Sequence, residues 1–405
     1  MASVGRLKSS LDELALLGGE PAFPEPLHVG RPNVGDRQAI LRRIADALDR
    51  RWLTNEGRYV LEFEQRLADA VGARHCVATC NGTLALQVAV RALGLRGEVV
   101  MPSLTFVASA HALAWEGLVP VFADVDPASL CLAPERAAAV TGPRTGALLG
   151  VHLWGRTCDV EALRALASER GLALVLDAAQ ALGCSHGGTP IGAHGDATIF
   201  SFHATKVANS FEGGAIATDD PELAERAAHM RNFGFGAEDV VVSIGTNAKM
   251  SEPAAAMGLA SLDALDSFVE RNRQNYERYR QALAPVRGVQ LLPLPLPETS
   301  NCHYIVVVVD PGTAGISRDE LQRVLVSENV LARRYFYPGC HRMEPYRSRD
   351  CAHAPLPVTE RLLERCLSLP TGTATAPEAI DRVCGLIELA VRHGDELATR
   401  LRAGQ

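Results

Sequence analysis

The chain has 405 residues and a mass of 43.3 kDa, enough to bury a large core and to form one large domain with a smaller companion. Its net charge is -7 and it has no block of Lys and Arg, which argues against a nucleic-acid-binding surface. Asp12 and Glu13 interrupt the first apolar run, and no segment approaches the roughly 18 apolar residues of a membrane span. We therefore expect a cytoplasmic protein without a membrane anchor.

The ten cysteines are scattered and include no Cys-x-x-Cys pair, so the sequence predicts no metal site. In a reducing cytoplasm most of them are expected to be small buried apolar residues rather than functional thiols.

From about residue 36, amphipathic helix patterns alternate with short apolar runs, which is typical of an α/β sheet. The expected strands, in chain order, are His75–Thr79, Glu98–Met101, Val119–Val125, Ala147–Val151, Ala173–Leu176, Thr198–Phe202 and Gly214–Thr218. Helical stretches such as Leu84–Leu93 and Val160–Arg170 are long enough for right-handed crossovers. We predict a mostly parallel, seven-stranded, doubly wound sheet whose ligands bind at the carboxyl ends of the strands.

The pattern changes after Met257. A long charged helix is predicted from Leu262 to about Val286, followed by the Pro-rich stretch Leu291–Pro297 and a strand at Ile305–Val309. We therefore expect an N-terminal segment (1–35), a large domain (36–265) and a smaller C-terminal α+β domain (266–405).

Three strand ends carry side chains that suit a phosphorylated aromatic ligand. At the first, Cys80-Asn-Gly-Thr83, backbone N–H groups and a hydroxyl at a helix start favour phosphate binding, although a plain capped turn has the same pattern. At the second, Asp177 follows a buried strand. A carboxylate there needs donors or a cation, such as a protonated pyridine nitrogen; a helix cap with Gln180 as reciprocal partner is the alternative.

Lys206 follows the next apolar run in the string FSFHATKVANSFEGG. Apolar neighbours would desolvate the amine, lower its pKa and favour imine formation, whereas most lysines are solvated surface residues. The phosphate turn, Asp177 and Lys206 occur in order at strand ends of one sheet. Together they supply contacts for the phosphate, ring nitrogen and aldehyde of pyridoxal 5'-phosphate.

With these residues in place, the sequence resembles the DegT/DnrJ/EryC1/StrS family of sugar aminotransferases, which has the aspartate-aminotransferase type of fold. The resemblance extends from about Leu27 to Pro370. Its most specific strings include WLTNEGRYVLEFE, CNGTLAL, MPSLTFVAS, VHLWG, LDAAQALG, FSFHATKVANSFEGGAI and GTNAKMSEPAAAMGL.

The resemblance implies that Lys206 carries pyridoxal 5'-phosphate as a Schiff base, with pyridoxamine 5'-phosphate as the intermediate form. It implies that Asp177 pairs with the ring nitrogen, that Gln180 approaches the ring hydroxyl and that the aromatic ring of Phe106 stacks on the cofactor. The phosphate contacts are Gly82, Thr83 and Ser201. Asn55, Tyr337 and His341 are further expected substrate contacts, and the loop YFYPGCH that contains Tyr337 and His341 departs from the family pattern Pro-Leu-His.

Asn247, in GTNAKM, matches a residue that reaches the phosphate from the neighbouring subunit, which implies a homodimer with shared active sites; without the match it would be an ordinary turn residue. The implied substrates are L-glutamate and a nucleotide-linked keto sugar. The FSFHATKVANSFEGGAI string looks most like enzymes that aminate C4 of a dTDP-linked 4-keto-6-deoxyhexose, in antibiotic or polysaccharide biosynthesis.

Three alternatives remain open from the sequence. The amine could be placed at C3 of the sugar. The chain could be a lyase or desulfurase with the same cofactor, for which Cys340 is the candidate nucleophile. It could also bind the cofactor as a non-catalytic regulator.

Overall fold

The computed structural model describes residues 7–294, 300–348 and 354–403. Its centre is a seven-stranded sheet in the order β2-β10-β9-β6-β5-β3-β4, in which only β10 runs antiparallel to its neighbours. The strands are β2 (His75–Thr79), β3 (Glu98–Pro102), β4 (Val119–Ala123), β5 (Thr145–Val151), β6 (Ala173–Asp177), β9 (Ala197–Ser201) and β10 (Gly214–Thr218). The predicted mostly parallel seven-stranded sheet is confirmed, with strand ends shifted by no more than two residues.

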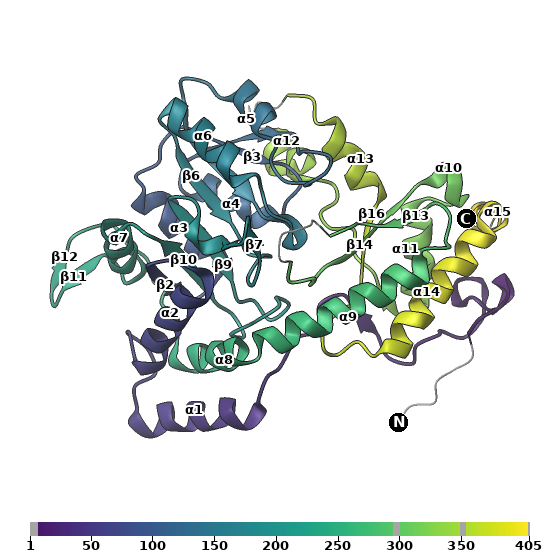
Figure 1. The fold of residues 1–405 in the computed structure, drawn as a ribbon, viewed down its shortest axis with the longest axis horizontal. Helices are drawn as coiled ribbons and strands as arrows, with labels where there is room; N and C mark the ends of the chain where they lie inside the picture. Colours follow the sequence, from purple (N-terminus) through teal and green to yellow (C-terminus); the bar gives the residue numbers. More distant parts are fainter. Residues whose placement is uncertain (1–6, 295–299, 349–353, 404–405) are drawn as a thin grey trace.

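Helices cover both faces of this sheet (Figure 1). Because successive side chains of a strand point to opposite faces, each strand contributes to the packing on both faces of the sheet. On one face pack α3 (Gly82–Ala92), α4 (Val107–Trp115) and α7 (Pro221–Arg231). On the other face pack α2 (Arg58–Val71), α5 (Pro134–Val140), α6 (Val160–Arg170) and α8 (Glu252–Asp263), with α1 (Arg37–Arg50) against α8.

A second core surrounds a three-stranded antiparallel sheet of β13 (Val289–Leu291), β14 (Ile305–Val309) and β16 (Cys366–Leu369). Its helices are α9 (Leu265–Leu283), α10 (Pro311–Ala314), α11 (Arg318–Ser327), α14 (Pro377–Arg392) and α15 (Gly394–Ala403). The N-terminal segment contributes Leu11, Leu14, Phe23 and Leu27 to this core, although it is distant in sequence. The strand predicted at Ile305–Val309 is confirmed, and the domain boundaries at 35 and 265 stay predictions.

The predicted helix from Leu262 to about Val286 is in part wrong, because it spans the junction between α8 and α9 at Ala264. Ala264 leaves the helical conformation (φ -104°, ψ 1°), and neither Gly nor Pro marks the break in the sequence. The predicted Pro-rich stretch Leu291–Pro297 begins in β13, and its last three residues lie outside the described residues.

Shorter elements connect these layers. They are β1 (Leu27–His28), β7 (Ser185–His186), β8 (Thr189–Pro190), β11 (Phe235–Ala237), β12 (Val240–Val241), β15 (Val330–Leu331), α12 (Glu344–Arg347) and α13 (Pro357–Arg365). β1 pairs with β15 in parallel, which ties the N-terminal segment to the second core. None of the described helices has both the length and the apolar character of a membrane span.

Gly214 lets the turn between β2 and α3 lie directly over the start of β10. A Cβ atom at this position would lie 2.6 Å from the Gly82 amide nitrogen and in contact with the Asn81 carbonyl group. These are backbone atoms, which cannot move aside as the end of a long side chain could. The missing side chain at Gly214 therefore fixes how closely the turn packs on the sheet.

We expect Gly214→Ala to destabilise the protein by about 1–3 kcal/mol, the usual cost of an extra methyl group in a packed site. Gly142→Ala is the matched control, because a Cβ at Gly142 would meet no atom within 4 Å. Thermal denaturation of both variants measures the difference. Equal melting temperatures would show that the turn can move without cost.

Candidate active site

A cavity of about 500 Å³ lies at the carboxyl ends of the parallel strands, where a doubly wound sheet places its ligands. Part of its wall comes from the chain around the three-stranded sheet: Tyr304 directly precedes β14, and Arg333 and Tyr335 follow β15. Seven of the residues predicted from the sequence line this cavity together: Gly82, Thr83, Phe106, Asp177, Gln180, Ser201 and Lys206.

One end of the cavity is formed by the N-terminus of α3. The first amides of a helix have no carbonyl in a preceding turn to bind, and the helix dipole makes this end positive. The Asn81 side chain accepts from the Leu84 amide at 2.8 Å, while Gly82 and Thr83 face the cavity. A Cβ at Gly82 would lie 3.0 Å from Ser201 Cβ, so a larger residue would require Ser201 to shift by a few tenths of an ångström. The arrangement suits a phosphate group.

Asp177 ends β6 and has two donors. Its Oδ2 accepts from the Ser109 hydroxyl at 2.7 Å, and its Oδ1 accepts from the Ala179 amide at 3.0 Å. No helix follows, because the chain turns at Ala179, and Gln180 Oε1 instead accepts from the Trp154 amide at 2.8 Å. The capping-box alternative is therefore wrong. The carboxylate keeps free lone pairs for a cationic donor in the cavity.

Lys206 lies in the turn after β9 and is partly buried. Burial lowers the pKa of its amine, and the negative charge of Asp177 acts in the opposite direction. The chain has three lysines, and the other two are held elsewhere: Lys8 donates to Glu328 at 2.8 Å and Lys249 to Asn232 at 2.9 Å. Lys206 is thus the lysine whose amine can act as a nucleophile inside the cavity.

Aromatic and basic side chains also line the cavity. Phe106 is 55% exposed, and the centroid of its ring is 5.9 Å from that of Phe336. Arg333 also lines the cavity, and its side chain is exposed.

Further residues line the cavity without having been predicted: Ser109, His203, Glu212, His303, Tyr304, Arg333 and Tyr335. Ser109, His203 and Glu212 lie inside strings that resemble the family, and that resemblance was the available signal. The others come from segments without a recognisable pattern.

Four predicted residues do not line this cavity. Asn55 and Asn247 are exposed elsewhere on the chain. The Tyr337 ring lies over Arg334, 4.7 Å from the guanidinium carbon to the ring centroid, and His341 is buried with its Nδ1 2.6 Å from the Ser103 hydroxyl. Their roles stay predictions.

Cys340 does not have the environment of a nucleophile. It is fully buried, and burial raises the pKa of its thiol to about 12. Because the thiolate is the reactive form, this environment counts against the desulfurase alternative. The other described cysteines are also buried, apart from the partly buried Cys80.

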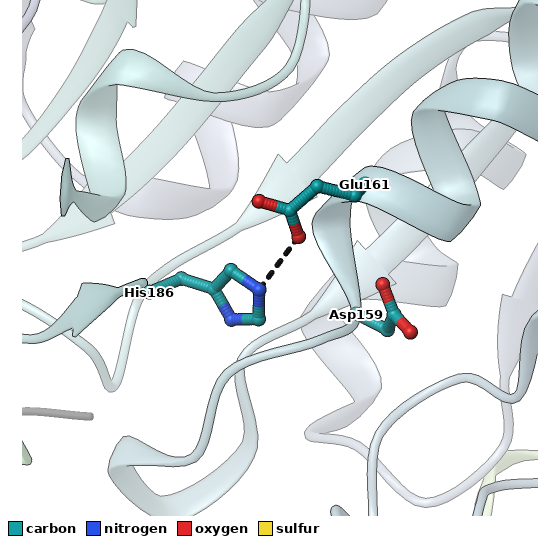
Figure 2. A group of neighbouring side chains, drawn as sticks. All are labelled: Asp159, Glu161 and His186. Carbon is teal, nitrogen blue, oxygen red and sulfur yellow. Dashed lines mark hydrogen bonds and ion pairs between the residues drawn. The ribbon is translucent and has the colours of Figure 1, made fainter. Parts of the chain in front are cut away.

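Asp159, Glu161 and His186 form a cluster away from the cavity, with one ligand atom of each within 4.8 Å of the others (Figure 2). Asp159 caps α6 through the Ala162 amide. His186 lies between Glu161, 2.7 Å from Nε2, and Thr157, 3.0 Å from Nδ1. Each side chain thus has a protein partner, and the expectation that the chain holds no metal stays a prediction.

The low pKa of Lys206 predicts that its amine reacts at lower pH than a free lysine. Acetylation of the three lysines, followed by peptide mass spectrometry across a pH series, measures the midpoint. Asp177→Asn should lower the midpoint further, because the Asp177 charge raises this pKa. Asp49→Asn, an exposed position on α1, is the control. An unchanged midpoint in Asp177→Asn would show that the two groups do not interact.

Comparison with known proteins identifies the family of the chain. The DegT/DnrJ/EryC1/StrS aminotransferase family matches residues 35–388. The dTDP-4-amino-4,6-dideoxy-D-glucose transaminase of Shigella dysenteriae is 38% identical over 323 residues, covering 80% of this chain and 88% of the relative. The GDP-perosamine synthase of Vibrio cholerae is 29% identical over 354 residues, covering 85% and 94%. The crystal structure of DesI in the presence of its TDP-sugar product has a TM-score of 0.94 at 52% identity, covering 97% and 100%. The chain therefore belongs to the DegT/DnrJ/EryC1/StrS family and is a sugar aminotransferase.

Proposed function

We propose that this enzyme uses pyridoxal 5'-phosphate to move the amino group of L-glutamate to C4 of a dTDP-linked 4-keto-6-deoxyhexose. The products are 2-oxoglutarate and a dTDP-4-amino-4,6-dideoxyhexose for antibiotic or polysaccharide biosynthesis, made in the cytoplasm. The observation that carries the proposal is the meeting of three groups in one cavity: an amine of lowered pKa, a strand-end carboxylate and a helix N-terminus.

The residues present fit the cofactor. Gly82, Thr83 and Ser201 would hold the phosphate, since they lie together at the start of α3. Phe106 offers an exposed ring for stacking. Because the Oε1 atom of Gln180 is occupied by Trp154, its Nε2 atom is available to donate to the ring hydroxyl. Bound there, the cofactor supplies an electron sink for the carbanion formed at the donor's α-carbon.

Lys206 and Asp177 have separate tasks in the proposed reaction. Asp177, fixed by Ser109, keeps a proton on the ring nitrogen through an ion pair. The Lys206 amine would take the proton from the donor's α-carbon and later return a proton to the sugar carbon. Both substrates are anionic, and the exposed guanidinium of Arg333 in the cavity wall supports their binding.

Support for C4 and for the dTDP nucleotide comes from the Shigella dysenteriae transaminase, whose name states both. The GDP-perosamine synthase relative favours a GDP-linked sugar as the second candidate substrate. Amination at C3 is the remaining alternative for the position of the amine.

We further propose a homodimer in which Asn247 reaches the partner's phosphate site. Asn247 is exposed, and it does not line the cavity of its own chain. Large apolar side chains are also exposed on or next to α1, α2, α7 and β12, elements that lie at the end of the molecule away from α14 and α15 (Figure 1). They are Leu48, Trp52, Leu61, Phe233, Val241 and Ile244. Where exposed apolar side chains form one continuous patch, they are typical of a protein interface.

The substrate proposal is tested by incubating the holoenzyme with glutamate and a panel of dTDP- and GDP-linked 3-keto and 4-keto sugars, with NMR to locate the new amine. We expect the amine at C4 of the dTDP-linked 6-deoxyhexose. Lys206→Ala is the control and should show neither turnover nor the visible absorption of a cofactor bound through an imine. Amine only at C3 would contradict the regiochemistry, and cofactor binding without turnover would favour the regulator.

The shared-site proposal predicts complementation between two inactive variants. Lys206→Ala and Asn247→Ala, unfolded and refolded together, should form about half mixed dimers. One site of each mixed dimer then has both residues intact, so roughly a quarter of wild-type activity should return. Verified mixed dimers without recovered activity would show that both residues serve the same chain's site.

A further inference from the structure

The residues that lead into β14 form a buried link with no regular secondary structure. Asn301 is 0% exposed and His303 is 6% exposed, and His303 also lines the cavity. Polar side chains buried outside helices and strands need specific hydrogen-bond partners. Between them, Cys302 has φ of +51°, a conformation that a non-glycine residue adopts only when its surroundings enforce it. The hydrogen-bond partners of Asn301 and His303 therefore hold this link in its conformation.

Asn301 holds the turn that follows Asp177. Its Nδ2 donates to the carbonyl oxygens of Gln180 and Leu182, both at 3.0 Å. Its Oδ1 accepts from the His303 amide at 3.1 Å, so the side chain is fully used. Asn301, in the link before β14, thus fixes two carbonyl groups of the turn that follows Asp177.

His303 holds the turn that carries Lys206. Its Nε2 lies 2.9 Å from the carbonyl oxygen of Thr205, the residue directly before Lys206. A carbonyl can only accept, so Nε2 must carry the proton. At the other side of the ring, Nδ1 lies 3.2 Å from the Asn272 amide nitrogen.

The orientation of Asn272 fixes the state of His303. The Asn272 amide nitrogen also donates to the carbonyl oxygen of Asn301 at 3.2 Å, and this contact would be lost if the amide were turned around. Nδ1 of His303 therefore accepts, and the ring is neutral with one tautomer. Burial lowers the pKa of His303 to about 4, so the same state holds at neutral pH.

We propose that Asn301 and His303 are positioning residues that hold the Asp177 turn and the Lys206 turn at a fixed separation. Both residues lie in the link before β14, and the side-chain amide of Asn272 on α9 contacts the Asn301 carbonyl oxygen and His303 Nδ1. The consequence for the reaction rests on the proposed function: the two groups must meet opposite ends of one rigid ring, so a shift of either turn misplaces the amine or the carboxylate. Neither residue is proposed to exchange a proton with substrate.

Two amide variants of His303 separate positioning from packing. The side chain of His303→Gln can reach the Thr205 carbonyl with its amide nitrogen, whereas the shorter side chain of His303→Asn cannot. In the cofactor-free protein, hydrogen exchange of the Lys206 amide, which donates to the His203 carbonyl at 2.9 Å, reports the turn directly. We expect exchange at least about fivefold faster in His303→Asn and near wild-type exchange in His303→Gln.

Kinetics of the loaded enzyme give the second measurement. His303→Asn should lower kcat about tenfold or more with little change in KM for glutamate, while His303→Gln retains most of kcat. Asn301→Ala provides an independent variant: exchange should accelerate at the Ala181 and Cys184 amides, which close the Asp177 turn, and less at Lys206.

Equal exchange and equal kcat in His303→Asn and His303→Gln would overturn the proposal, as would unchanged exchange at Ala181 and Cys184 in Asn301→Ala. The amides of α6 serve as the internal reference in every sample. Failure of the proposed function looks different: the wild type itself would neither bind the cofactor through Lys206 nor transfer an amine, while exchange in the cofactor-free variants would still decide the role of the link.

Discussion

Burial and the charge of Asp177 have opposite effects on the pKa of Lys206, and the rest of the site depends on the balance between them. A nucleophilic amine must lose its proton, which burial favours, yet the cavity also needs the Asp177 carboxylate, whose charge stabilises the protonated amine. The fold meets both requirements because β6 and β9 are neighbouring parallel strands and both groups follow their carboxyl ends. The Ser109 hydroxyl and the Ala179 amide donate hydrogen bonds to the Asp177 carboxylate, and these bonds stabilise its negative charge.

This arrangement explains why the surrounding backbone is so closely packed. The α3 N-terminus can face the same cavity only if its turn lies against the sheet, and two glycines make that possible. Gly82 faces Ser201, and Gly214 lies under Asn81. A side chain at Gly214 would clash with the backbone of the turn and displace the helix start, whereas one at Gly82 would press only on the Ser201 side chain. In the proposed function, phosphate binding and imine formation are therefore coupled through backbone contacts.

Much of the large domain could be predicted from sequence because its strands are short, apolar and ended by polar residues. The cofactor side of the cavity follows from those ends, and Gly82, Asp177 and Lys206 were found there. The wall from the second core could not be predicted in the same way. Arg333 and Tyr335 come from an irregular segment after β15, and His303 from the link before β14, where no periodicity exists. The break at Ala264 was also invisible, because alanine favours helices.

The cavity is lined partly by residues at strand ends and partly by residues from irregular segments, and this difference bears on which sugar the enzyme accepts. The groups to which we assign the aminotransfer chemistry, Lys206, Asp177 and the α3 amides, lie at the ends of strands of the seven-stranded sheet or at the start of the adjoining helix, where strand register fixes their position. Arg333 and Tyr335 enter the cavity from irregular chain, which tolerates substitution with less cost to the sheet. Substitutions that change the accepted sugar are therefore expected in the irregular segment that contains Arg333 and Tyr335. The Asn301–His303 link limits how far the second core can change, since it also supports the turns beneath the cofactor site.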